Sequence, residues 1–401
     1  MSNLPPGLRN ARILAICQGL YIAAISIDLT LTALTGQMLA PYPALATLPF
    51  ALITVAGAAV TWYASLLMQR IGRRAGFVLG SLAGAAGGLI SVAAVYTSDF
   101  WLFCLGTALV GVFQAFAQYY RLAAADAVPA EAKSRAISVV LTGGVIAAIA
   151  GPALAAWAKD LFPAATFAGA YLMVALLGLA SALLLIAYRD QDGFPAAETQ
   201  ASGLPARPLG VVMRQPIFVA ALANNVVGSV SMMFVMTAAP LAAVACQHSI
   251  ADGASIMQWH LVGMYAPAFF AGALINRLGL PRVLGMGMAL NAACSLIAMQ
   301  STSLAAFHAA LFCLGVGWNF MFVGGTTLLA QSYRPAERAR VQGAAEMLRY
   351  ATTALATLAA GPALQRMGWE TLNAAMLPIV GLAAVMTGWW ALSRRAGQVA
   401  A

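Results

Sequence analysis

Twelve long apolar runs, separated by short polar segments, constrain the fold of this chain more than any other feature. A helix needs about 20 residues to cross the ~30 Å hydrocarbon core of a bilayer, because it rises ~1.5 Å per residue. Only 8% of the residues are charged and 62% are hydrophobic, which no ordinary soluble domain matches. The sequence therefore predicts an all-α membrane protein with twelve transmembrane helices. The runs occupy residues 13–34, 44–68, 76–97, 100–122, 136–158, 165–188, 215–244, 256–276, 283–300, 303–330, 342–364 and 371–392.

One extended polar stretch, residues 189–214, divides these runs six and six. Its aspartates, glycines and prolines are typical of a linker. We therefore predict an N-terminal six-helix bundle at residues 1–188, a cytoplasmic linker at 189–214 and a C-terminal six-helix bundle at 215–401.

Three pairs of short motifs recur in the same order at nearly the same spacing, which indicates that one half is an approximate copy of the other. The segment from Ser65 is repeated 207 residues later from Gly272, Gly151-Pro152 is repeated after 210 residues as Gly361-Pro362, and Pro129-Ala-Glu131 is repeated after 206 residues as Pro335-Ala-Glu337.

The basic residues predict the orientation in the membrane. If both termini are cytoplasmic, 18 of the 21 Lys and Arg residues lie on the cytoplasmic side and only Lys159 and Arg366 lie opposite. Such a bias is typical of inner-membrane proteins. The basic residues form no continuous face that could follow a phosphate backbone, so nucleic acid is not an expected partner.

Charged residues within apolar spans are costly and are therefore candidates for function. Asp28 lies in the first span, where it is a candidate for proton coupling; alternatively, it lies near the outer end of the helix and is simply hydrated. Glu346 and Arg349 are three residues apart and are expected to pair along one helix face. They are candidates for gating or coupling, and the alternative is a structural pair that neutralises itself.

A second set of candidates combines sulfur and imidazole. Met232 and Met236 are one helical turn apart in the seventh span, and His260 and Met264 are one turn apart in the eighth. Three thioethers and one imidazole form a soft ligand set, which selects Cu(I). The alternatives are ordinary methionine packing and a hydrogen-bonded or proton-relaying histidine.

The chain resembles the major facilitator superfamily over essentially its whole length. The loop signature of that family has matches after the second and eighth spans, and the resemblance implies two pseudo-symmetric six-helix bundles with substrate bound near the midplane between them. Ser65 and Gln69 stand where the family signature has glycine and aspartate, and Asn276 stands at the aspartate position of the second copy. The matching residues are Arg70, Gly72, Arg73 and Arg74 in the first copy, and Gly272, Arg277 and Gly279 in the second.

At Met232, Met236, His260 and Met264 the sequence is also similar to the CcoA-like copper importer branch of this superfamily. That resemblance implies a secondary transporter that imports copper as Cu(I) across the bacterial inner membrane for heme-copper oxidase assembly. Cys246, in the loop between the two spans, is then a candidate for metal delivery, and the alternative is an ordinary loop thiol. Copper would be cargo and not a cofactor, and copper chaperones on the periplasmic and cytoplasmic sides would be partners.

Two alternatives stay open. The same branch includes riboflavin importers, and Tyr119, Tyr120, Trp318 and Phe320 are aromatic residues that could stack on a flavin ring. The other alternative is a membrane-embedded assembly partner that hands copper on without transporting it. No nucleotide-binding loop or catalytic motif occurs in the sequence, so we expect neither an enzyme nor a primary pump.

Overall fold

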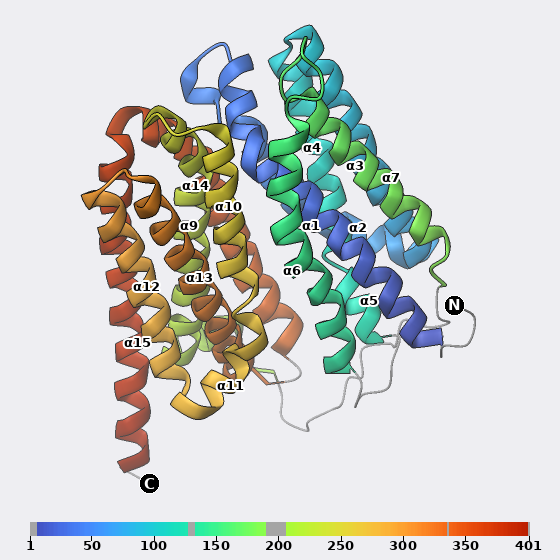
Figure 1. The fold of residues 1–401 in the computed structure, drawn as a ribbon. Helices are drawn as coiled ribbons and strands as arrows, with labels where there is room; N and C mark the ends of the chain where they lie inside the picture. Colours follow the sequence, from blue (N-terminus) through green and yellow to red (C-terminus); the bar gives the residue numbers. More distant parts are fainter. Residues whose placement is uncertain (1–5, 127–132, 190–205, 335–336, 400–401) are drawn as a thin grey trace. The chain divides into compact units, whose positions relative to one another are not determined.

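The computed structural model describes residues 6–126, 133–189, 206–334 and 337–399, and every regular element within these ranges is a helix. Helices are expected here because, in hydrocarbon, backbone N–H and C=O groups must be satisfied within the segment itself. The elements (Figure 1) are α1 (Pro6–Leu39), the 3-10 helix η1 (Pro43–Leu45), α2 (Leu48–Ile71), α3 (Arg73–Thr97), α4 (Phe100–Ala117), α5 (Tyr120–Asp126), α6 (Lys133–Ala158), α7 (Ala168–Ile186), α8 (Leu209–Met213), α9 (Pro216–Ala245), α10 (Ile250–Tyr265), α11 (Ala268–Leu278), α12 (Leu280–Gln300), α13 (Leu304–Ser332), α14 (Arg338–Ala374) and α15 (Met376–Val399).

Each of the twelve predicted spans overlaps a helix or the bent pair α10 and α11, and the fourth span also runs past the end of α4 into α5. Within the described ranges, nine helices are long and apolar enough to cross a membrane, and the bent pair makes ten. The other two predicted spans are α6 and α14. The apolar part of α6, Gly143–Ala158, is shorter than the rest, and α14 carries Glu346, Arg349 and Arg366 along its length.

The chain divides into two compact units. The first comprises Met1–Ala196 with Ala239–Gln258, and the second comprises Ala197–Ala238 with Trp259–Ala401. The ends of α9 and α10 that adjoin their connecting loop thus belong to the first unit. The predicted bundle and linker boundaries stay predictions.

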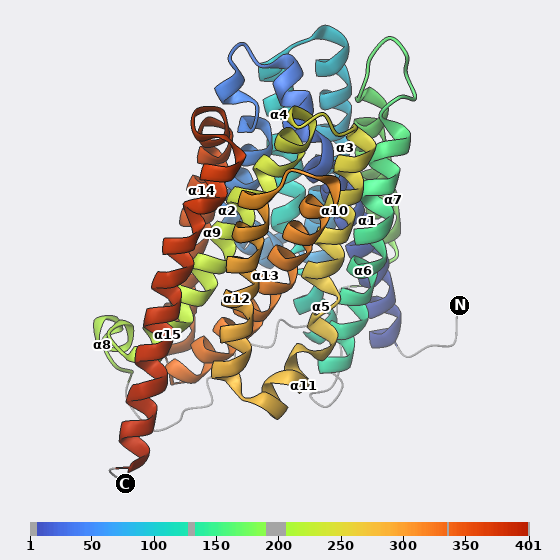
Figure 2. The same ribbon diagram turned by 60° about the vertical axis from the view of Figure 1, so that its left-hand side comes forward.

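Glycines allow the helices of the first unit to approach closely. α1 packs along α6 (Figure 2), and α3 packs on both α4 and α7. A Cβ at Gly143 in α6 would overlap the carbonyl oxygen of Ala15 in α1, and Gly57 in α2 meets Gly111 in α4. Small residues at such contacts are the usual means by which membrane helices pack.

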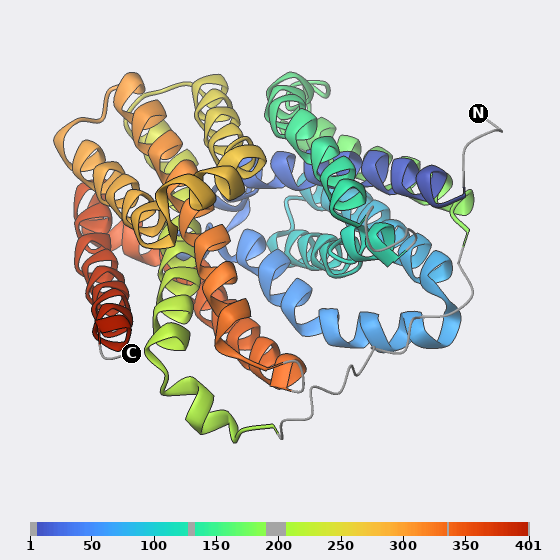
Figure 3. The same ribbon diagram turned by 90° about the horizontal axis from the view of Figure 1, so that it is seen from below.

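The second unit repeats this packing. Gly263 in α10 meets Gly315 in α13, and these two glycines lie 206 and 204 residues after Gly57 and Gly111. α12 packs on α13 and α15, and Figure 3 shows α15, dark red, beside the orange α12. The internal repeat read from short motifs is therefore also present in the helix contacts of each unit.

The eighth span differs from its prediction as one continuous helix. It is broken between Tyr265 and Ala268, and α10 and α11 are bent by 46° at the break. Pro267 lacks the N–H that would bond to the carbonyl oxygen of Gly263, and its ring crowds the preceding turn. In the last turn before the break, the carbonyl oxygen of Met264 accepts a hydrogen bond of 2.7 Å from Nδ2 of Asn319 in α13.

Candidate functional site

The four predicted copper ligands are all buried in the second unit. Met232 and Met236 lie one turn apart on α9, and His260 and Met264 lie one turn apart on α10. These placements agree with the predicted helices and faces. That the four side chains form one ligand set stays a prediction.

His260 is held in a defined tautomer. Its Nδ1 lies 2.7 Å from the carbonyl oxygen of Leu311 in α13, and because a carbonyl can only accept, Nδ1 carries the hydrogen. Nε2 therefore has a free lone pair, and it is buried without a hydrogen-bond partner among the described residues. Gly315 makes this contact possible, because a Cβ there would lie 2.5 Å from the carbonyl oxygen of His260. The imidazole can accept a proton, a donor hydrogen or a metal ion at Nε2.

Cys246 lies just after α9, in the loop before α10, and its thiol is free and half-buried. This position agrees with the predicted loop. A delivery role for Cys246 stays a prediction.

Asp28 is buried within the first unit. α1 continues to Leu39, so Asp28 does not lie at a helix end, and it is 0% exposed. The alternative of a hydrated carboxylate at the outer end of the helix is therefore wrong. One carboxylate oxygen accepts a 3.0 Å hydrogen bond from the hydroxyl of Thr32, while the other has no partner among the described residues.

Two further hydroxyl groups, those of Tyr171 and Thr35, belong to the surroundings of this carboxylate. The hydroxyl of Tyr171 in α7 donates to Oγ1 of Thr35 at 2.9 Å and approaches Oγ1 of Thr32 at 3.4 Å. Asp28, Thr32, Tyr171 and Thr35 thus form a buried polar network between α1 and α7. Such a network can hold a proton on Asp28 or release it along the hydroxyls.

Glu346 and Arg349 form the predicted pair on α14. Nη2 of Arg349 lies 2.6 Å and Nε lies 3.0 Å from Oε2 of Glu346. The Arg349 side chain is only 14% exposed, whereas that of Glu346 is 45% exposed. The guanidinium carbon also lies 5.6 Å from the ring centre of Phe322 and 4.2 Å from that of Tyr350.

The two copies of the loop signature share one backbone feature. Gly72 has φ 85° and ψ 156° between α2 and α3, and Gly279 has φ 83° and ψ 150° between α11 and α12. Only glycine adopts this region without strain. The other signature residues occupy the neighbouring helix ends: Arg70 ends α2, Arg73 and Arg74 begin α3, and Gly272, Asn276 and Arg277 lie exposed on α11.

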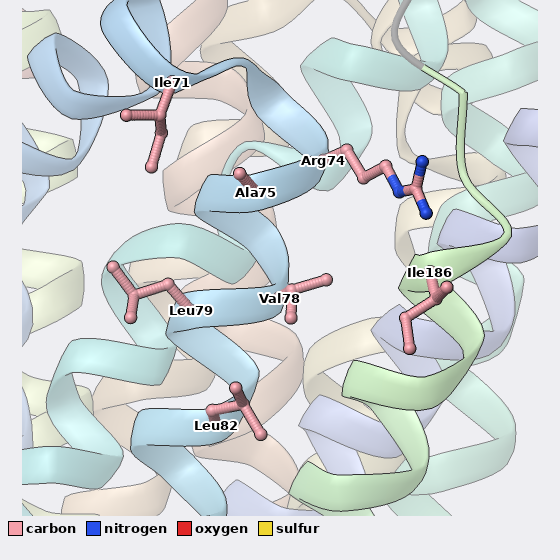
Figure 4. A pocket seen from close by; sticks show the side chains of 7 residues that line it. All are labelled: Ile71, Arg74, Ala75, Val78, Leu79, Leu82 and Ile186. Carbon is pink, nitrogen blue, oxygen red and sulfur yellow. The ribbon is translucent and has the colours of Figure 1, made fainter.

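A groove of about 570 Å³ adjoins the first copy (Figure 4). Arg74 stands at one end, and the remaining lining is apolar, including Val78 and Leu82 of α3 and Ile186 of α7. Apart from Arg74, these side chains offer no hydrogen-bonding group for a polar substrate.

The four aromatic residues considered for flavin stacking differ in their surroundings. Tyr120 is fully buried and packs edge-on against Phe77, Phe320 lies in a hydrophobic core cluster, and the hydroxyl of Tyr119 donates to the carbonyl oxygen of Thr61. Trp318 is partly exposed, and its indole N–H has no hydrogen-bond partner among the described residues.

Phe322, which the sequence analysis missed, lies stacked on Trp318. The spacing of four residues between the two was the available signal. The contact of Phe322 with Arg349 of α14 is tertiary and had no signal in the sequence.

Comparison with known proteins identifies a family and several relatives. The family model described as "Major Facilitator Superfamily" matches residues 14–245 and 229–400. The chain is 40% identical to the riboflavin transporter RfnT of Brucella anthropi over 387 residues, which is 96% of each chain. It is 28% identical to the uncharacterized transporter YdeG of Bacillus subtilis, covering 85% of this chain and 82% of that protein.

A solved structure shares the fold. It is the crystal structure of a bacterial homolog of the human lysosomal transporter Spinster, in an inward-facing and unoccupied conformation. The match has a TM-score of 0.70 and covers 98% of each chain at 14% sequence identity.

Proposed function

Because the chain belongs to the major facilitator superfamily, we propose that it is a secondary transporter that imports riboflavin, or a closely related flavin, across the bacterial inner membrane. The observation that carries this proposal is the 40% identity to a riboflavin transporter, which extends over 96% of the chain. Both termini are cytoplasmic in this proposal, because the basic residues concentrate on that side.

The comparisons give no support to copper import, which the spacing of the methionines and His260 favoured. One observation keeps copper as the second candidate: Nε2 of His260 is a buried, unpartnered lone pair. The same lone pair serves a flavin transporter equally well, because it can accept a hydrogen bond from a ribityl hydroxyl or from the ring N–H.

Coupling is proposed at Asp28. A buried carboxylate with one unpartnered oxygen changes its environment strongly on protonation, so proton entry and release there can be linked to helix movement. Glu346 and Arg349 are proposed to act at the substrate.

The test measures riboflavin and copper uptake side by side in cells that lack their own flavin importer and cannot synthesise riboflavin. The proposal predicts growth at low external riboflavin and no change in cellular copper. His260→Ala tests the copper hypothesis separately, because a copper importer that uses His260 as a ligand would lose copper uptake in this variant. Copper accumulation that depends on His260, without riboflavin rescue, would overturn the proposal in favour of copper.

A further inference from the structure

Two aromatic rings form a short stacked pair, here called the aromatic surface, on one face of α13. Trp318 and Phe322 are four residues apart, which places them one above the other along the helix. Their ring centres lie 5.1 Å apart and their planes differ by only 14°, which is the offset stacked arrangement that aromatic rings favour. Both side chains are partly exposed, so this surface is not enclosed in the core.

A fixed positive charge lies beside this surface. The guanidinium carbon of Arg349, from α14, is 5.6 Å from the ring centre of Phe322, within the range of cation–π attraction. Glu346 holds the guanidinium through Nε and Nη2. Because both bonds use one carboxylate oxygen, the remaining N–H groups of the guanidinium fork point away from Glu346, and one of them meets the Tyr350 hydroxyl.

The surface also has an unused donor. The indole Nε1–H of Trp318 is shielded from solvent and has no acceptor among the described residues. A buried donor without a partner lowers stability by about 1–3 kcal/mol, so an acceptor that arrives with a ligand is bound favourably there.

We propose that Trp318, Phe322 and Arg349 form the subsite for the flat ring system of the transported flavin; this inference rests on the function proposed above. The isoalloxazine ring is planar, electron-poor and carries two carbonyl oxygens at its pyrimidine edge. The ring stacks on the face of the electron-rich indole, and its carbonyl edge accepts hydrogen bonds from Arg349. The indole N–H lies in the plane of the indole, so it donates to a ribityl hydroxyl and not to the stacked ring. Glu346 is a positioning residue that fixes Arg349.

The aromatic end of the substrate fits this surface better than the ribityl chain does. A polyol needs several hydrogen-bond partners, whereas the exposed parts of Trp318 and Phe322 are mainly ring carbon. Aromatic surface of this kind gains most from burying another ring.

Purified full-length protein in lipid vesicles provides the test, with initial rates of riboflavin uptake as the readout. Trp318→Leu is expected to raise KM about tenfold, in the range that loss of one stacking partner produces. Lumiflavin, which has the ring without the ribityl chain, inhibits uptake by the wild-type protein and is expected to lose most of that inhibition in Trp318→Leu. Trp318→Phe keeps a stacking face and is expected to retain most of the affinity. Trp157→Leu, at a tryptophan that is 63% exposed on α6, is the matched control and leaves KM unchanged.

A second readout covers the case in which Trp318→Leu fails to fold. Stacking on an indole quenches flavin fluorescence, so riboflavin is quenched by the wild-type protein in detergent and less so by Trp318→Phe. If wild-type vesicles do not accumulate riboflavin, the proposed function fails. If they do, and Trp318→Leu keeps the wild-type KM and its inhibition by lumiflavin, the function stands and the subsite is refuted.

Discussion

Gly279→Ala tests whether the loop signature is required for its backbone conformation. Gly279 has φ 83° and ψ 150°, and alanine there costs about 1–3 kcal/mol because its Cβ crowds the neighbouring peptide groups. The added methyl group meets nothing else, since the nearest atom beyond the adjacent residues is Cδ of Pro281 at 3.9 Å. The expected loss of stability is therefore a backbone effect alone.

A matched control lies six residues further along the chain. Gly285 is inside α12, and a Cβ there meets nothing within 4 Å. Gly285→Ala is expected to raise stability by about 0.5–1 kcal/mol, because glycine is the poorer helix former. The same chemical change is thus expected to act in opposite directions just before α12 and inside it.

Thermal unfolding of the purified protein in detergent measures the difference. One kcal/mol shifts Tm by roughly 2–4 °C for a unit of 150–250 residues, so Gly279→Ala is expected to lower Tm by about 2–12 °C. Gly72→Ala, at the equivalent position of the first copy, is expected to have a similar effect. Equal shifts for Gly279→Ala and Gly285→Ala would refute the conformational explanation.

Three further predictions concern charge, coupling and packing. The Arg207 guanidinium, bonded to both carboxylate oxygens of Glu337, holds the pKa of Glu337 well below its usual range. The stability that this depressed pKa contributes is present above pH ~4.3 and is lost as pH falls below it. Glu337→Gln is therefore expected to lower Tm at pH 7 and to show a smaller fall in Tm under acid conditions than the wild-type protein. A Tm profile that parallels wild type would contradict this. Asp28→Asn is expected to abolish riboflavin accumulation driven by a pH gradient while preserving exchange of labelled for unlabelled riboflavin across vesicles, and unchanged accumulation would exclude Asp28 from coupling. Gly315→Ala forces α10 and α13 apart and is expected to cost roughly 1–3 kcal/mol by thermal unfolding, whereas Gly343→Ala, with open space around its Cβ, has no such cost.

The helices were predictable because bilayer thickness fixes how long an apolar run must be. The break in the eighth span was not, although Pro267 is visible in the sequence. Pro152, Pro240 and Pro362 also lie inside predicted spans, and α6, α9 and α14 each contain their proline without ending there. Whether a proline breaks a helix depends on the tertiary contacts around it, and here Asn319 from another helix bonds to the carbonyl of Met264 in the last turn before the break.

The candidate site was predictable where contacts are local. Glu346 and Arg349 pair because they are three residues apart on one helix. The burial of Asp28 followed from where α1 ends and from packing against Tyr171 of α7, and neither can be read from the residues around position 28. The choice of Trp318 over Tyr119, Tyr120 and Phe320 likewise required tertiary contacts.

The break at Pro267 allows the two helices of the eighth span to move separately. α10 is fastened to α13 by the bond from His260 to Leu311 and by the bond from Asn319 to Met264. α11 begins beyond the break and ends just before Gly279. The backbone hydrogen bond that Pro267 cannot donate would have joined α11 to α10. The loop end of α11 can therefore move without displacing the imidazole of His260.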